Sequence, residues 1–347
     1  MKRPISKLIR PSVLRLKPYS SARDEFKGNS DGMVFLDANE NPFGSGLNRY
    51  PDPKQNKLRT ELAALKGVQV DKLLLGNGSD EVLDLIVRVF CEPKEDNMIL
   101  LPPTYGMYEV VAGVNNIDVI KVNLKSDFQP NVDAILEEVN DFTKIIFLCS
   151  PNNPSANTML NSSVEEILNN FDGIVVIDEA YADFSTGPGW VDQLDNFPNL
   201  IVTQTLSKAY GLAGIRLGMC FASEEIINAL NRIKPPYNIN QLTQDEALKA
   251  VGQQNDVLGQ IKEILKQRDE LTEALNDLSI VKHVWPSEAN FLLVEVDKAN
   301  QRYNELIELG IVVRNRSSLP GCNNCLRFTV GTEEENQKLI QALNQLK

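Results

Sequence analysis

Lys208 has the sequence surroundings of a reactive amine rather than those of an ordinary surface lysine. It follows an apolar stretch, residues 199–204, that is expected to be a buried strand, and it precedes a glycine-rich segment that ends at Arg216. A lysine at the end of a buried strand can lose its proton and act as a nucleophile. Taken alone, the motif is also compatible with a plain structural lysine.

Three further motifs place polar residues directly after expected strands. Residues 76–81 form a glycine turn that leads into a helix, whose N-terminal N–H groups suit a phosphate. Residues 150–154 present Asn153 between two prolines, and residues 178–181 begin with Asp178 and end with Tyr181. Each motif also has a purely structural alternative: a strand-to-helix turn at 76–81, an Asn-Pro turn at 150–154 and a helix N-cap at 178–181.

The elements that must position these motifs alternate along the middle of the chain. β-rich stretches of four to six residues alternate with helix-like stretches, which predicts a mostly parallel sheet covered by helices. The expected strands are 72–75, 97–101, 118–122, 144–149, 173–177, 199–204 and 219–222, and the expected helices are 79–90, 105–114, 132–139, 164–169 and 223–232. Ser79 is the expected N-cap of the first helix. Ligands bind beyond the carboxyl ends of such strands, so the four motifs should meet in one site.

The pattern changes after Pro235 and Pro236. Residues 243–278 are charged and amphipathic, which predicts one long helix or two helices joined near Gln267. Strands are expected at 290–296, 311–314 and 326–330, and helices at 300–309 and 333–345. We therefore expect a large ligand-binding domain over residues 48–236 and a small α+β domain over residues 237–347 that includes the long connecting helix. Residues 1–47 are expected to form an N-terminal arm on the surface.

The composition excludes several kinds of site and partner. The 35 Lys and Arg against 47 Asp and Glu give a net charge of −12, which argues against a nucleic acid or an anionic membrane as a partner. No apolar run reaches the roughly 18 residues of a membrane span. His283 is the only histidine, so neither a histidine-based triad nor a metal site is expected. The five scattered cysteines favour a reducing, cytoplasmic location, and Cys322 and Cys325 are interpreted as loop residues.

Together, the four motifs supply what pyridoxal 5′-phosphate requires from a protein. The cofactor needs a lysine for its aldehyde, a carboxylate for its pyridine nitrogen and donors for its phosphate. Because the four motifs together meet all three requirements, this joint interpretation outweighs the purely structural alternative for each motif.

On these residues the sequence resembles the class II, fold type I pyridoxal-phosphate-dependent aminotransferases and, within them, the histidinol-phosphate aminotransferase family. The resemblance extends from about Leu16 to the C-terminus through the motifs at 36–42, 49–53, 76–81, 150–154, 178–181, 207–216 and 326–331. It implies an α/β fold: a large domain with a seven-stranded, mostly parallel sheet sandwiched by helices, plus a small α+β domain. One departure is Ser155 followed by Ala156, where the family commonly has Thr-Gly.

At matching positions the resemblance implies contacts to the cofactor ring. Lys208 would bind the cofactor covalently as the internal aldimine and would later act as the catalytic base. Asp178 would pair with the pyridinium nitrogen, Tyr181 and Asn153 would bond the ring oxygen, and Tyr105 would stack on the ring.

The resemblance also implies contacts to the two anions of the site. The residues matching the cofactor-phosphate contacts are Ser79, Asp80, Ser207 and Arg216, with Tyr50 of the neighbouring subunit, so a homodimer with a shared active site is implied. The residues matching the substrate contacts are Tyr19, Asn39, Arg314 and Arg327.

The implied activity is that of an enzyme, a histidinol-phosphate transaminase of L-histidine biosynthesis. It would convert L-histidinol phosphate and 2-oxoglutarate into imidazole-acetol phosphate and L-glutamate. The alternatives are an aromatic amino-acid aminotransferase and a threonine-phosphate decarboxylase-like enzyme that also uses pyridoxal phosphate. A pyridoxal-phosphate-sensing module of a transcription regulator is not expected, because it would need a basic DNA-binding domain before Leu16.

Overall fold

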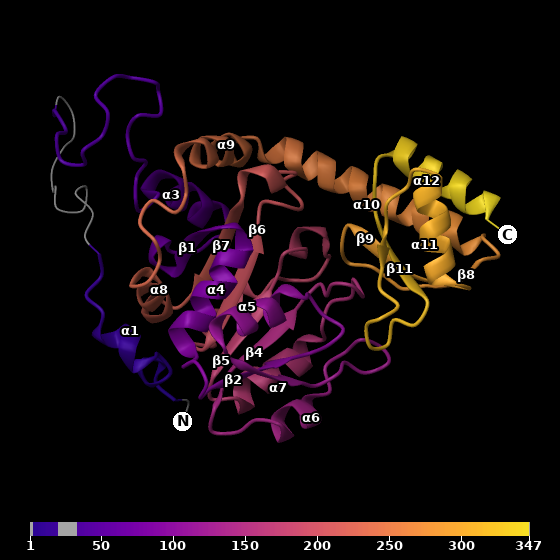
Figure 1. Ribbon diagram of the computed structural model, residues 1–347, viewed down its shortest axis with the longest axis horizontal. Helices are drawn as coiled ribbons and strands as arrows, with labels where there is room; N and C mark the ends of the chain where they lie inside the picture. Colours follow the sequence, from indigo (N-terminus) through magenta and orange to yellow (C-terminus); the bar gives the residue numbers. More distant parts are fainter. Residues whose placement is uncertain (1–2, 20–32, 347) are drawn as a thin grey trace.

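A seven-stranded sheet forms the centre of the protein in the computed structural model, which describes residues 3–19 and 33–346 (Figure 1). The strands lie in the order β1-β7-β6-β5-β4-β2-β3. They are β1 (Leu73–Asn77), β2 (Asn97–Leu100), β3 (Asp118–Lys121), β4 (Thr143–Cys149), β5 (Ile174–Asp178), β6 (Leu200–Thr205) and β7 (Leu217–Ala222). Only β7 runs against its neighbours, β1 and β6. The expected seven-stranded, mostly parallel sheet is confirmed, with strand ends within two residues of the expected ones.

Helices cover both faces of this sheet because its inner strands are apolar on both sides. On β4, for example, Ile145 and Phe147 join one hydrophobic cluster, whereas Ile146 and Leu148 join the other. The helices of the first cluster are α4 (Gly78–Phe90), α5 (Met107–Asn115) and α8 (Glu224–Asn231); those of the second are α3 (Asn56–Leu65), α6 (Val132–Glu137) and α7 (Asn161–Asn170). The sheet is therefore sandwiched between two helical layers, as expected.

The N-terminal segment packs onto the first of these layers. It contains two short helices, η1 (Ile5–Lys7) and α1 (Pro11–Arg15), whose buried apolar side chains belong to the same hydrophobic cluster as α4 and α8. The Arg10 guanidinium fixes the segment by donating two hydrogen bonds to the Glu92 carboxylate, at 2.9 and 3.1 Å. The part of the arm after residue 32 projects away from the rest of the molecule (Figure 1).

Two helices lead to a second, smaller sheet. They are α9 (Gln241–Gly252) and α10 (Gln254–Asn276), so the break falls at Gln253 and the expected joint near Gln267 is wrong. The physical reason is that Gly252, the last residue of α9, is a weak helix former, whereas Gln267 is buried and bonds the side chains of Glu263 and Glu270 within the helix. Figure 1 shows α10 extending from the large sheet to the small one.

The small sheet is antiparallel, in the order β10-β11-β9-β8. Its elements are β8 (Val281–Val284), β9 (Phe291–Val296), α11 (Ala299–Glu308), β10 (Arg314–Asn315), β11 (Cys325–Thr329) and α12 (Glu333–Gln345). The strand expected at 311–314 is mostly wrong, since only Arg314 of that range pairs. Ile311 instead bonds the carbonyl of Leu306 at the end of α11, and Val312 is 80% exposed.

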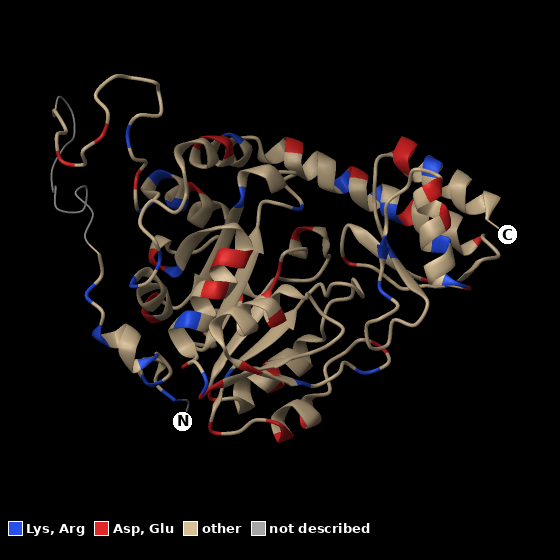
Figure 2. Ribbon diagram, in the orientation of Figure 1, with Lys and Arg blue, Asp and Glu red and all other residues tan. Residues whose placement is uncertain are grey.

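The surface charge is mixed in sign. Figure 2 shows Lys and Arg interspersed with Asp and Glu along the helices rather than collected on a single element. Within residues 3–19 and 33–346, no helix has the length and hydrophobicity needed to cross a membrane.

Candidate active site

Nine of the sequence-predicted site residues line one pocket beyond the carboxyl ends of the parallel strands. The segments that follow β1, β2, β4, β5 and β6 supply them, as expected for an open α/β sheet. They are Ser79, Asp80, Tyr105, Asn153, Asp178, Tyr181, Ser207, Lys208 and Arg216. The pocket therefore collects a primary amine, carboxylates, two phenols, an amide and a guanidinium in one place.

Asp178 ends strand β5 and is buried, with 3% of its surface exposed. Its carboxylate accepts hydrogen bonds from the Tyr108 hydroxyl at 2.7 Å, the Ala180 N–H at 3.1 Å and the Thr203 hydroxyl at 3.2 Å. Burial raises the pKa of this carboxyl, and the three hydrogen bonds oppose that rise. A group held in this way can place a negative charge against a cationic ligand atom.

Tyr108 is a site residue that the sequence analysis missed. It lies in the first turn of α5, is fully buried and stacks on Phe147 with ring centroids 4.9 Å apart. Its position three residues after Tyr105 gave one usable signal, since residues three apart lie on the same side of a helix. Nothing in the sequence, however, indicates that its hydroxyl would donate to Asp178.

Lys208 lies in the turn after β6, where its amine has no ion-pair partner in the part of the chain that the structure describes. Burial lowers the pKa of this lysine, and the positive charge of Arg327 lowers it further. Nζ lies 5.6 Å from the centre of the Tyr181 ring. The neutral, nucleophilic form of the amine is thereby favoured relative to a lysine in water.

The N-terminus of α4 forms a cradle for an anion together with Arg216. The helix begins at Gly78 with Asn77 as its N-cap, so the expected N-cap at Ser79 is wrong. The first N–H groups of a helix have no partner within it and attract anions. Nη2 of Arg216 lies 3.6 Å from the Asp80 carboxylate and faces this cradle across Gly78. The arrangement suits a phosphate.

Gly78 is required by this cradle. Its φ is +77°, and a Cβ built there would lie 2.5 Å from Nη2 of Arg216. Any side chain at position 78 would therefore strain the backbone and displace the guanidinium.

Arg327 of β11 connects the small sheet with the pocket. Its Nη1 donates to the Asn153 side-chain oxygen, and the Asn153 amide in turn donates to the Tyr181 hydroxyl at 3.4 Å. The Arg327 guanidinium lies 5.0 Å from the centre of the Phe291 ring. Arg314 faces Arg327 directly in the β10–β11 register, so the two cations predicted to bind substrate are neighbours.

The Ser155 and Ala156 departure is accommodated in the loop that carries Asn153. Ala156 adopts a φ of +63°, a conformation that favours glycine. The Ser155 hydroxyl accepts a hydrogen bond from the Asn152 amide at 2.7 Å, and the N–H of Ala156 donates to the carbonyl of Asn152 at 2.7 Å. The turn therefore keeps its hydrogen bonds despite the different residues.

Besides Arg314 and Arg327, three further predicted site residues do not line this pocket within the single chain. Tyr19 is 72% exposed, Asn39 lies in the projecting arm, and Tyr50 stacks on Tyr237 with ring centroids 4.6 Å apart. The structure of one chain does not bring them to Lys208, and their roles stay predictions.

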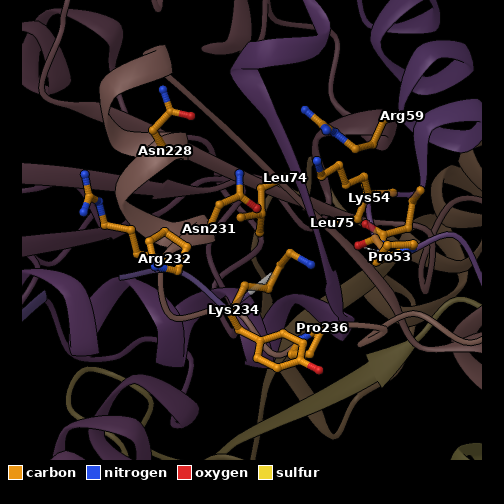
Figure 3. A pocket seen from close by; sticks show the side chains of 13 residues that line it. Pro53, Lys54, Arg59, Leu74, Leu75, Asn228, Asn231, Arg232, Lys234 and Pro236 are labelled. Carbon is orange, nitrogen blue, oxygen red and sulfur yellow. Dashed lines mark hydrogen bonds between the residues drawn. The ribbon is translucent and has the colours of Figure 1, made fainter. Parts of the chain in front are cut away.

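Tyr19 lines a separate, larger pocket between α3, α8 and β1 (Figure 3). The two arginines there hold backbone carbonyls. Arg59 donates to Leu73 and Val70, and Arg232 donates to Leu14 and Leu16. These guanidinium groups tie neighbouring segments together.

Comparison with known proteins identifies the family of the chain. Residues 34–343 match the family model "Aminotransferase class I and II". Proteins described as histidinol-phosphate aminotransferase are 57% identical in Christiangramia forsetii and 56% identical in Flavobacterium johnsoniae, each over 99% of this chain and 98% of the relative. Another, from Parabacteroides distasonis, is 55% identical over 98% of both chains.

Solved structures share the fold. The histidinol-phosphate aminotransferase from Clostridium acetobutylicum has a TM-score of 0.80 at 23% identity, covering 87% of this chain and 91% of that one. The enzyme of the same name from Sinorhizobium meliloti, in complex with pyridoxal-5′-phosphate, has a TM-score of 0.79 at 23% identity, covering 86% of this chain and 83% of that one.

Proposed function

Since the chain belongs to the class I and II aminotransferases, we propose that it is a pyridoxal-phosphate-dependent histidinol-phosphate transaminase. It exchanges the amino group of L-histidinol phosphate with 2-oxoglutarate, giving imidazole-acetol phosphate and L-glutamate in L-histidine biosynthesis. The observation that carries the proposal is the convergence of Lys208, Asp178 and the N-terminus of α4 in one pocket. The 50% to 57% identity to curated relatives of that name supports the choice of substrate.

The pocket fits pyridoxal phosphate at each of its polar ends. The cradle of α4 and Arg216, with Ser207, would hold the phosphate, and Asp178 would face the ring nitrogen. Asn153 and Tyr181, already bonded to each other, would contact the ring oxygen, and Tyr105 would lie against the ring. When bound, the cofactor supplies an electron sink for the bonds at the substrate Cα.

The residues of the chain would then divide the work. The buried Asp178 carboxylate would hold a proton on the ring nitrogen, since its anionic form already accepts three hydrogen bonds. The Lys208 amine, whose pKa is lowered by burial and by Arg327, would take the proton from the substrate Cα. Lys208 is therefore both the anchor of the cofactor and the base, which explains how a chain with one histidine moves protons.

Arg327 and Arg314 would bind the anionic end of each substrate. A guanidinium presents parallel N–H groups that match either a carboxylate or a phosphate. One pair of arginines can therefore serve both the phosphate of histidinol phosphate and a carboxylate of glutamate in the alternate half-reaction. Tyr19 and Asn39 are proposed to complete the substrate site.

The proposed substrate is tested by a half-reaction titration. Holoenzyme mixed with L-histidinol phosphate alone should convert its cofactor spectrum completely, and 2-oxoglutarate should restore it. A strong preference for phenylalanine or tyrosine in the same titration would indicate an aromatic amino-acid aminotransferase instead. Release of carbon dioxide from threonine phosphate without any need for a 2-oxo acid would indicate a decarboxylase.

We also propose a homodimer in which the projecting arm reaches the neighbouring subunit and brings Tyr50 to its cofactor phosphate. The arm exposes large apolar side chains, with Val34, Leu36 and Phe43 each more than 80% exposed. Apolar surface of this extent is typical of an interaction site. Sedimentation as a particle of one chain's mass would contradict the dimer.

We propose a cytoplasmic location, with which the five free, buried cysteines are consistent.

Gly78→Ala is expected to weaken cofactor binding roughly 10- to 100-fold, because the new Cβ strains the backbone and displaces Arg216. The measurement is a titration of apoenzyme with pyridoxal phosphate, followed by absorbance. Gly113→Ala is the matched control, since a Cβ at that helical position meets nothing within 4 Å. Equal affinities of the two variants would contradict the assignment of the cradle.

A further inference from the structure

A third arginine, Arg316, lies on the same face of the small sheet as Arg314 and Arg327. Arg314 faces Arg327 in the β10–β11 register, and the N–H of Arg316 donates to the carbonyl of Cys325 at 2.9 Å, which continues that register. Side chains alternate along a strand, so residues two apart lie on one face. The three guanidinium groups therefore extend from the same side of the sheet, the side on which Arg327 reaches the Lys208 pocket through Asn153.

None of these three arginines forms an ion pair with a carboxylate within residues 3–19 and 33–346. Burial and the neighbouring charges of Arg327 and Arg314 lower the pKa of Arg316 to about 10, and no carboxylate contributes to that shift. The pKa of Arg327 is likewise lowered, by burial and by Arg314. A buried arginine in a structural role is normally paired with an acid, as Arg302 is with Asp297 and Glu305.

Arg316 also has an unused hydrogen-bond donor. Its Nε is buried and forms no hydrogen bond with any of the described residues. The same holds for Nε of Arg327. Buried donors of this kind cost free energy unless a ligand satisfies them. The hydrogen bond from the N–H of Arg316 to the carbonyl of Cys325 fixes the backbone at this position. The Nε donor is therefore restricted in the directions it can take.

We propose that Arg316 is a third phosphate-binding residue, which makes the substrate site selective for a phosphate-bearing amine over a purely carboxylate-bearing one. A phosphate monoester carries about −1.5 to −2 charges at neutral pH and three acceptor oxygens, whereas a carboxylate carries one charge and two oxygens. Three convergent cations match the first anion better than the second. The inference rests on the proposed function, because it assigns a residue to the phosphate of the proposed substrate.

The test compares Arg316→Gln with the unchanged holoenzyme on both half-reactions. The KM for L-histidinol phosphate should rise roughly 10- to 100-fold, the loss expected for one hydrogen-bonded charge, while the rate of the glutamate half-reaction changes less than about 3-fold. Binding of inorganic phosphate to the holoenzyme, measured by calorimetry, should weaken in parallel. Arg316→Lys retains the charge but loses the planar guanidinium. Its KM for L-histidinol phosphate and its affinity for phosphate should lie between those of Arg316→Gln and those of the unchanged enzyme.

Arg88→Gln is the control for lost charge, since Arg88 pairs with Asp84 on the surface of α4. It should leave both half-reactions and phosphate binding unchanged. Equal losses on histidinol phosphate and glutamate in Arg316→Gln and Arg316→Lys would mean a structural role and overturn the inference, and so would unchanged phosphate binding. If the unchanged enzyme does not use histidinol phosphate but Arg316→Gln still weakens phosphate binding, the proposed function fails and the assignment of Arg316 stands.

Discussion

Lys208→Ala is expected to abolish transamination, with turnover reduced by roughly four orders of magnitude or more. The variant removes both the amine that anchors the cofactor and the base that moves the proton at the substrate Cα. No other amine is available for either task, because Lys208 is the only lysine that lines the described pocket. The measurement is the steady-state rate with L-histidinol phosphate and 2-oxoglutarate, together with the absorbance of the lysine-bound cofactor, which should disappear.

Lys249→Ala provides the matched control. Lys249 pairs with Glu246 on the exposed side of α9, so its loss should leave turnover and the cofactor spectrum unaltered. Added methylamine should restore part of the activity of Lys208→Ala, because a small amine can enter the space that the side chain leaves. Turnover of the variant near the original rate would refute the central role given to Lys208.

The large sheet and its ligand-binding edge could be predicted because the apolar pattern of each strand also indicates where the strand lies in the fold. Strands such as β5 are continuous apolar runs that only a doubly covered sheet can bury. The polar residue that ends each run must then lie at the carboxyl edge. Asp178 ends strand β5 and Lys208 follows strand β6, which is its direct neighbour, so their proximity follows from the topology alone.

Features that depend on tertiary contacts could not be predicted. The hydrogen bond from Tyr108 to Asp178 joins residues 70 positions apart. The apolar run from Ile311 to Val313 has the composition of a strand, but the C-terminal turn of α11 takes up the N–H of Ile311. Arg316 belongs to none of the motifs in the sequence, and only the pairing of β10 with β11, continued by the bond from the N–H of Arg316 to the carbonyl of Cys325, reveals its shared face with Arg327.

Asp178→Asn is expected to lower kcat roughly 100- to 1,000-fold while cofactor binding is largely retained. The amide has the size of the carboxyl, and one side-chain oxygen can still accept bonds from Thr203 and the N–H of Ala180. It carries no negative charge, however, and so cannot hold a proton on the ring nitrogen. Stopped-flow rates of each half-reaction, with the cofactor content determined separately, measure the two effects independently.

Tyr108→Phe separates the charge of Asp178 from its hydrogen bonding. This variant keeps the carboxylate and removes a single donor at 2.7 Å, so a smaller loss of roughly 10-fold is expected. Burial raises the pKa of Asp178 and the Tyr108 hydroxyl opposes that rise, so removing the hydroxyl should shift the acidic limb of the kcat profile to higher pH. Unchanged kinetics of Asp178→Asn, or a larger loss in Tyr108→Phe, would mean that the carboxylate orients the tyrosine rather than stabilising charge.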